Sequence, residues 1–281
     1  MDRLKGIFIS SLVVFIVFGT FFSAYSLALA PYSWAWLGNL LSFGVGSIYF
    51  GGIYLITTPR TSKNMWATWL PLLLGTLLVI YATFDATSNY LPLALNLFML
   101  AGWFLYTYWA TDFSGRDKKL LQVGMPMPNI TLTNLEGNEV SIDSFLGAPA
   151  ILLFYRGNWC PFCMAQIKEL AQEYQQIQAK GAALVFISPQ SPKHTKYLAQ
   201  KFDIPAVFLR DQDLKAATQL NLFHQNGTPT GMEVLGFQSD NVLPTLILLD
   251  AQGIIRFVDL TDNYRLRPEP SLYLDLLANL T

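Results

Sequence analysis

The sequence has few charged residues, and those that it has are unevenly distributed. Asp, Glu, Lys and Arg make up 13% of the 281 residues, against about 25% in ordinary soluble domains. Between residues 6 and 110 the only charged side chains are Arg60, Lys63 and Asp85. The first 110 residues therefore lack the polar surface that a soluble domain needs, and the chain is predicted to have two parts in different solvents.

Basic runs and cysteines are also scarce. The formal net charge is −1, and no run of Lys and Arg is interleaved with aromatic residues, which argues against nucleic acid as a partner. The two cysteines, Cys160 and Cys163, are too few for the disulfide framework of a secreted protein. Zinc would need two more ligands, and His194 and His224 are not spaced to supply them. We therefore expect no metal and no cofactor, and we interpret the cysteines as a redox pair rather than a structural disulfide.

Four apolar runs occupy the first part of the chain, at residues 6–30, 40–57, 66–84 and 91–110. Each is close to the ~20 residues that a helix needs to cross the hydrocarbon of a bilayer. Aromatic residues cluster near the ends of these runs, where amphipathic rings favour the headgroup layer. Residues 1–112 are therefore predicted to be a multi-pass region of four transmembrane helices in a cell membrane, with lipid as a partner.

Lysine and arginine are biased to one set of ends of these helices. They precede the first run, lie between the second and third, and follow the fourth, whereas the two opposite loops contain none. This bias predicts that both termini and the soluble part lie on the cytoplasmic side. A cleaved signal peptide ending near Ala28 to Ala30 is the alternative for the first run, but its apolar core is longer than the 7–15 residues typical of such signals.

Small residues are frequent in the second run, at Gly44, Gly46, Ser47, Gly51 and Gly52. Such spacing is more typical of close helix packing in membranes than of a cofactor loop. This half of the chain has neither cysteine nor histidine. It is therefore interpreted as an anchor or an interaction platform.

The second part alternates strand-like and helix-like segments. Residues 113–127 are predicted to be a linker, and residues 128–281 an α/β domain with helices on both sides of its sheet. A hairpin is expected at residues 129–142, and a short helix at 141–146. Strands are expected at 150–155, 183–187, 207–209, 245–249 and 254–259, with helices at 164–180, 192–202, 213–220 and 271–280. Residues 224–241 are expected to form a surface loop.

Cys160 follows a strand that is predicted to be buried, and it lies where a helix begins. Free N–H groups and the helix dipole at that position stabilise a thiolate. Pro161 suits a first helical turn, and Cys163 lies one turn further on the same face. We expect Cys160 to be the nucleophile and Cys163 the resolving thiol. Arg156 carries a positive charge that favours the thiolate of Cys160, although it is equally compatible with a solvated position.

The segment from Phe154 to Cys163, with the preceding Ser-Phe-Leu-Gly at residues 144–147 and Leu-Pro-Thr at 243–245, resembles the AhpC/TSA, or peroxiredoxin-like, branch of the thioredoxin superfamily. The resemblance covers about residues 125–281 and implies a thioredoxin fold with antioxidant activity. It also implies that Trp159 and Pro161 flank the reactive sulfur. Pro244 would be a cis-proline opposite the cysteines, with the main chain of Leu243 binding a thiol substrate.

Two positions depart from the patterns of this superfamily. Peroxiredoxins place Pro and Thr or Ser seven and three residues before the reactive cysteine, and this chain has Leu153 and Gly157. Thioredoxins have a buried acid six residues before the nucleophile, and this chain has Phe154. The leading hypothesis is therefore a membrane-anchored thiol–disulfide oxidoreductase that acts on a protein thiol or disulfide. A thiol peroxidase, which needs a peroxide and a thiol reductant, and a redox sensor are the alternatives.

Overall fold

The structure is a computed structural model, and it describes residues 2–56, 61–84 and 89–280. The chain divides into two compact units. Residues 7–57 and 61–112 form the first, here called the helical unit, and residues 113–281 form the bulk of the second, here called the α/β domain. Arg60 and Asp85, two of the few charges noted above, lie outside the described residues.

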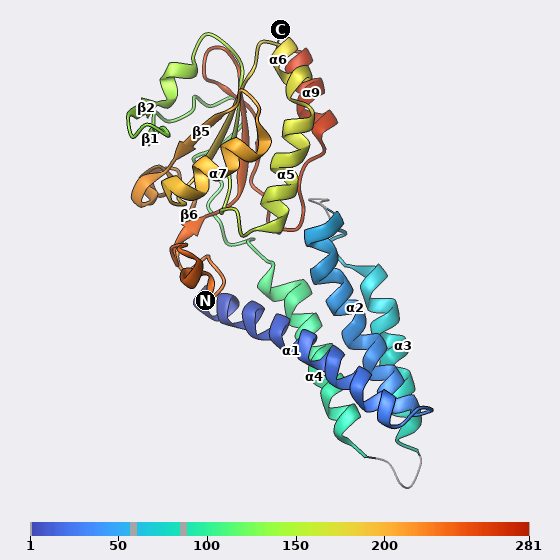
Figure 1. The fold of residues 1–281 in the computed structure, drawn as a ribbon. Helices are drawn as coiled ribbons and strands as arrows, with labels where there is room; N and C mark the ends of the chain where they lie inside the picture. The colour runs from blue at the N-terminus through green and yellow to red at the C-terminus, as the bar shows by residue number, and fades with distance from the viewer. Residues whose placement is uncertain (1, 57–60, 85–88, 281) are drawn as a thin grey trace. The chain divides into compact units, whose positions relative to one another are not determined.

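The helical unit consists of long helices at the predicted positions (Figure 1). They are α1 (Asp2–Leu29), α2 (Trp34–Ile56), α3 (Trp66–Ala82) and α4 (Leu91–Leu105), with a π-helical turn, η1 (Tyr106–Ala110), continuing α4. Their side chains are apolar on almost every face. A helix that is apolar all round is suited to the interior of a protein or to a membrane.

Two of these helices are long and apolar enough to cross a membrane, as judged by length and composition. They are the segments Arg3–Leu29 and Leu91–Ala110. Helix α3 is apolar but has 17 residues, which is short of the ~20 needed for a straight crossing. Helix α2 has 23 residues but is not one of these two segments. The prediction of four spanning helices is thus supported for two of them.

Glycines allow α2 and α3 to pack at close range. A Cβ atom on Gly38 would lie 2.5 Å from the carbonyl oxygen of Gly75, and one on Gly46 would lie 2.9 Å from the side chain of Met99. By contrast, Cβ atoms on Gly44 or Gly51 would meet open space. Close packing by small residues therefore occurs as predicted for Gly46, and also at Gly38 and Gly75, which were not among the residues predicted from the sequence.

The α/β domain is built on one main sheet. Its strands are β1 (Thr131–Thr133), β2 (Glu139–Ser141), β3 (Ala150–Phe154), β4 (Ala183–Ser188), β5 (Val207–Arg210), β8 (Thr245–Leu249) and β9 (Ile255–Asp259). They lie in the order β2-β1-β5-β4-β3-β8-β9. The pair β6 (Phe223–His224) and β7 (Asn241–Val242) forms a second, small sheet. Strand β3 runs parallel to β4 and antiparallel to β8, so it occupies the buried centre.

Helices cover both sides of this sheet (Figure 1). Helices α5 (Pro161–Gln172), α6 (Tyr174–Ala179) and α9 (Pro270–Ala278) lie together on one side, and α7 (Pro192–Phe202) lies on the other. Shorter elements are α8 (Lys215–Gln219) and the 3-10 turns η2 (Ile142–Phe145), η3 (Gln212–Leu214) and η4 (Met232–Leu235). This is the layered α/β arrangement expected from the alternating sequence pattern.

Residues 113–127, for which we expected a linker, pack onto the α/β domain. Phe113, Leu121 and Met127 are buried. The Phe113 N–H donates to the carbonyl of Asp262 at 2.7 Å, and the Gly124 N–H donates to that of Ile255 at 2.8 Å. The segment resembles a linker because it is polar at its start and ends in the run Gly-Met-Pro-Met, yet its apolar side chains add to the core of the domain.

Candidate active site

Strand β3 places the cysteine segment at one end of the central sheet. All five residues of β3 are buried, and the Tyr155 N–H extends the pairing by donating to Ile187 at 2.9 Å. The chain then leaves the sheet and reaches Cys160, which is the N-cap residue of α5, with Pro161 in the first turn. The predicted strand–loop–helix arrangement around the cysteines is present.

Gly157 shapes the loop between the strand and the helix. Its φ is +139°, a conformation that L-residues rarely adopt. A Cβ atom at this position would lie 3.0 Å from two atoms of the Trp159 indole, and the Gly157 carbonyl accepts a 3.1 Å hydrogen bond from the Cys160 N–H. Backbone geometry and contact with Trp159 therefore favour glycine at the position where the family has a hydroxyl residue.

Both cysteines are free thiols, with exposed fractions of 2% for Cys160 and 1% for Cys163. Burial opposes the Cys160 thiolate, but a hydrogen bond from the Cys163 thiol and the positive charge of Arg156 outweigh it and lower the pKa of Cys160 from 9.0 to about 6. Burial, together with donation of that hydrogen bond to a negative neighbour, raises the pKa of Cys163 well above its ordinary value. The two thiols are thus differentiated into a nucleophile and a proton-bearing partner.

Arg156 is buried and in contact with the loop that it precedes. Its guanidinium lies 4.6 Å from the centre of the Trp159 ring, and its Nη2 donates to the carbonyl of Gly227. A buried guanidinium close to a sulfur favours the thiolate more strongly than a solvated one, because screening by water is weaker. The solvated alternative for Arg156 is therefore not the arrangement found here.

Leu243 and Pro244 lie at the same end of the sheet as the cysteine loop, because Thr245 pairs with Phe154. No cis peptide bond occurs among the described residues, so the Leu243–Pro244 bond is trans and the predicted cis-proline is wrong. Trans is the favoured isomer of X–Pro bonds. With this geometry, the Leu243 N–H donates to Leu222 at 2.7 Å, and the Leu243 carbonyl accepts from Thr245 at 2.9 Å. A substrate would have to compete for both groups.

Three residues from distant parts of the sequence complete the surroundings of the thiols. The Tyr264 ring lies 5.5 Å from the ring of Phe162, a residue that lies between the two cysteines in the sequence. It also lies 5.7 Å from the Arg156 guanidinium. Arg267 is buried, and its charge favours both thiolates. Arg116 donates to Thr245 Oγ1 at 2.6 Å and to the Pro244 carbonyl at 3.3 Å. No local sequence pattern marks these three residues, and only the fold brings them here.

A partly buried carboxylate, Asp259, acts on the arginines of this site. Burial raises the pKa of Asp259, while the charges of Arg267 and Arg116 act against that rise. Burial also lowers the pKa of Arg116 to about 10, opposed by the negative charge of Asp259. The positive charge beside the sulfurs is therefore partly balanced by Asp259, which limits the net charge that the site must bury.

Both histidines pack against aromatic rings. His194 stacks on Phe237 at 4.3 Å, and burial lowers its pKa. His224 meets the ring of Phe113 at 5.2 Å. Within residues 2–56, 61–84 and 89–280, no group of three His, Cys, Asp or Glu side chains is placed to hold a metal ion.

The α/β domain is therefore thioredoxin-like, with a dithiol at the start of the helix that follows its central strand. The AhpC/TSA family model matches residues 123–258 of the chain. This part of the chain is accordingly an AhpC/TSA domain, as the sequence resemblance predicted.

Curated relatives agree with this family. A putative peroxiredoxin bcp from Helicobacter pylori is 29% identical over 138 residues, which are 48% of this chain and 85% of the relative. Peroxiredoxin Q from Sedum lineare is 29% identical over 139 residues, 48% of this chain and 67% of the relative. The thiol-disulfide oxidoreductase ResA from Bacillus cereus is 26% identical over 157 residues, 56% of this chain and 79% of the relative. Both kinds of relative are oxidoreductases, and so is this chain.

Proposed function

We propose that the chain is a membrane-anchored thiol–disulfide oxidoreductase that uses Cys160 and Cys163. The observation that carries this proposal is the asymmetric thiol pair at the start of α5. Cys160 has its pKa lowered to about 6, and Cys163, one turn later, donates a hydrogen bond to it. Disulfide exchange needs a thiolate to attack and a protonated second thiol within reach to resolve the intermediate.

In the proposed cycle the Cys160 thiolate attacks a sulfur of a substrate disulfide. A mixed disulfide forms, and the other substrate sulfur leaves as a thiolate. Cys163 then gives up its proton and attacks the Cys160 sulfur, which releases the second substrate thiol and leaves a Cys160–Cys163 disulfide. Two electrons have passed to the substrate, and a thiol reductant restores the pair.

The proton of Cys163 has no carboxylate to receive it at the position that thioredoxins use. That position is Phe154, which is fully buried in β3. The departing substrate thiolate is then the nearest group that becomes basic during the reaction. Resolution is therefore expected to depend on the substrate thiol, because a more basic thiolate takes up the proton of Cys163 more readily whereas a more acidic one leaves the Cys160 sulfur faster.

Peroxide reduction is the second candidate function, and the peroxiredoxins among the relatives favour it. The Cys160 thiolate would attack one oxygen of a peroxide, breaking the O–O bond, and the other oxygen would leave as hydroxide or alkoxide and take up a proton. The resulting sulfenic acid would condense with the Cys163 thiol to give the same disulfide and water. Against it stands Gly157, which lacks the hydroxyl of the family and where a positive φ and the indole of Trp159 disfavour any side chain. A redox sensor, the third hypothesis, would show slow turnover with every substrate.

The deciding experiment uses the full chain in detergent, carrying Cys163→Ser so that only Cys160 reacts. We expect sulfenic acid to form with hydrogen peroxide at a rate close to that of free cysteine, and a stable mixed disulfide to form rapidly with a peptide disulfide. Oxidation by peroxide several orders of magnitude faster than that of free cysteine would replace the first proposal by the second. Cys160→Ser is the matched control and should do neither.

Anchoring in the membrane is part of the proposal. Helices α1 and α4 with η1 carry it, because they are long and apolar enough to cross. Aromatic residues at the ends of α2 and α3 support the further expectation of a multi-pass bundle. Membrane fractionation tests the proposed anchor, because an integral membrane protein stays with the membrane in alkaline carbonate. Release of the protein into the supernatant would show that the proposed anchor is wrong.

A further inference from the structure

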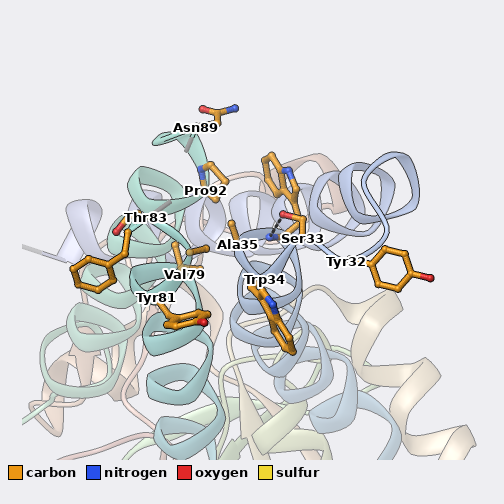
Figure 2. Close-up of a pocket in the computed structure, with 12 residues that line it drawn as sticks. Tyr32, Ser33, Trp34, Ala35, Val79, Tyr81, Thr83, Asn89 and Pro92 are labelled. Carbon is orange, nitrogen blue, oxygen red and sulfur yellow. Dashed lines mark hydrogen bonds between the residues drawn. The ribbon is translucent and has the colours of Figure 1, made fainter. Parts of the chain in front are cut away.

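A cavity of about 530 Å³ lies at one end of the helical unit, among the ends of α2, α3 and α4 (Figure 2). Its lining includes Trp34, Ala35, Val79 and Tyr81, and none of the described residues that line it is charged or carries a thiol. This cavity therefore has no group that could act on a disulfide. The α/β domain differs, because a buried amide there holds the segment that leads to Cys160.

That amide belongs to Gln190, in the turn between β4 and α7, and the backbone of this turn is itself held. Pro189 precedes Gln190 and Pro192 follows two residues later, and each proline ring fixes one backbone torsion. The Gln190 N–H donates to Ser188 Oγ at 3.3 Å, and the Gln190 carbonyl accepts from Arg210 Nε at 3.1 Å. Gln190 has an exposed fraction of 4%, so its side chain starts from a fixed backbone and has little room to move.

The side-chain amide of Gln190 bridges two residues that precede the cysteines. Its Oε1 accepts from the Asn158 main-chain N–H at 3.0 Å, and its Nε2 donates to the Tyr155 hydroxyl at 2.9 Å. Because a main-chain N–H can only donate, the amide oxygen must face Asn158, and the amide nitrogen is left for Tyr155. Both ends of the amide are therefore used, and they join the loop before Cys160 to the end of β3.

The loop at residues 157–159 has further contacts with the same region. The Asn158 Nδ2 donates to the His194 carbonyl in the first turn of α7 at 2.9 Å. A Cβ atom on Gly157 would lie 3.4 Å from Gln190 Oε1, so the loop passes in contact with the amide. The Cys160 N–H in turn donates to the Gly157 carbonyl at 3.1 Å. The place of Cys160 is thus set by a loop that Gln190 holds.

The other end of the bridge lies in the surroundings of Cys163. Tyr155 is fully buried. Burial raises the pKa of its hydroxyl, a hydrogen bond with Ser188 acts against the rise, and the charge of Cys163 adds to it. The phenol therefore stays neutral and acts as a fixed point beside the resolving thiol rather than as a base.

We propose that Gln190 is a positioning residue for the second step of the thiol–disulfide exchange, an inference that rests on the proposed function. In that step the Cys163 thiolate attacks the Cys160 sulfur, and the bond between Cys160 and the substrate breaks. The substrate sulfur leaves with the electron pair and takes up the proton that Cys163 lost. The three sulfur atoms must be aligned, and the amide bridge holds the loop of Cys160 against the region of Cys163. The first step needs the Cys160 thiolate alone and does not depend on this alignment.

The test separates the two steps in the full chain in detergent, with dithiobisnitrobenzoate, a disulfide of two coloured thiols. Attack by Cys160 releases one coloured thiol per chain, and resolution by Cys163 releases a second. Gln190→Met has a side chain of similar length without the amide. Its first release should keep the parent's rate, whereas its second should be about 10- to 100-fold slower, because a misplacement of ~1 Å is enough for the upper value.

Gln166→Met is the matched control. Gln166 lies in α5 with an exposed fraction of 2%, and its Nε2 has no hydrogen-bond partner among the described residues, so both releases should follow the parent's rates. Tyr155→Phe keeps the ring but cuts the bridge at its other end, and it should also slow the second release. It decides the question if Gln190→Met is not folded, as judged by circular dichroism and gel filtration.

Two results would overturn the assignment: a second release at the parent's rate in the folded variants, or an equal slowing of both releases. A glutamine that only stabilises the fold would not act selectively on one step. Absence of the first release in the parent chain would instead contradict the proposed disulfide exchange itself, so the two failures are distinct.

Discussion

At the scale of single residues, the chemistry of Cys160 depends on groups that stabilise its thiolate against burial. In Cys163→Ser, whose hydroxyl can donate the same hydrogen bond, alkylation by iodoacetamide should therefore rise with pH around a midpoint well below 9.0, near the pKa of about 6 that Cys160 has beside Cys163. Because this pKa lies below its ordinary value, the thiolate also stabilises the fold at high pH, and that contribution is lost as pH falls through about 6. A midpoint above 8 for the alkylation rate would mean that burial dominates.

The charge of Arg156 is one of these stabilising groups. Arg156→Met keeps a long apolar side chain but removes the charge, so the alkylation midpoint of Cys160 should rise by about 1, the lower end of the range for a nearby charge. Arg256→Met is the matched control. Arg256 lies in β9, is half exposed and forms an ion pair with Asp250 at 2.7 Å. It is not among the charges that act on Cys160. An equal rise in both variants would point to a general change in the domain.

A substitution at Gly157 tests whether this position can accept the Thr or Ser that peroxiredoxins have three residues before the reactive cysteine. Gly157→Thr should lower the free energy of unfolding by about 1–3 kcal/mol, because a β-branched residue is forced to a positive φ against Trp159. Urea unfolding measures this change. Adding Trp159→Leu should recover part of the loss by removing the contact, and a single variant as stable as the parent would show that the loop can rearrange to accept the hydroxyl.

The sequence predicted the two cysteines and their order of reactivity, because helix-start chemistry is local. It did not predict Tyr264, Arg267 or the buried role of Arg116. These residues are separated from Cys160 by 44 residues or more, and they reach it only through the pairing of β3, β8 and β9 and the turn after β9. The trans Leu243–Pro244 bond was also missed, because the cis form was taken from the family resemblance and not from local residues.

At the scale of elements, hydrophobic periodicity located the strands well and the helix breaks poorly. Leu170, Tyr174 and Ile177 keep helical spacing through residues 164–180, but α5 ends at Gln172 and α6 starts at Tyr174. Between them Glu173 has φ −87° and ψ 3°, a change that the spacing of apolar residues does not reveal. Similarly, the short strands β6 and β7 lie in a stretch whose Gly, Asn and Thr content indicated only a loop.

The segment 113–127 is an element whose role the composition concealed, and a truncation tests it. A soluble fragment beginning at residue 112 should be more stable to urea than one beginning at 128. The shorter fragment loses the buried side chains of Phe113, Leu121 and Met127, each of which contributes about 1.5–3 kcal/mol when fully buried. We expect a difference of at least about 3 kcal/mol, and equal midpoints would show that the segment is dispensable.

At the scale of the whole molecule, the distribution of charge decides on which side of the membrane the dithiol works. Arg3 and Lys5 lie at the start of α1, Lys63 precedes α3, and Lys118 and Lys119 follow α4. Part of this bias has a second role in the folded domain, since Lys118 is paired with Asp262 at 2.6 Å. The unfolded chain still presents these charges during insertion, so the positive-inside bias predicts a cytoplasmic domain.

Protease treatment of vesicles measures this orientation. The α/β domain should resist digestion in right-side-out vesicles and be degraded in inverted ones. A cytoplasmic domain meets a reducing thiol pool, so acid quenching of cells followed by alkylation should find Cys160 and Cys163 as a dithiol, poised to give electrons to a substrate. Digestion in right-side-out vesicles would place the pair in an oxidising compartment, and the trapped disulfide expected there would make the protein an acceptor of electrons from substrate thiols.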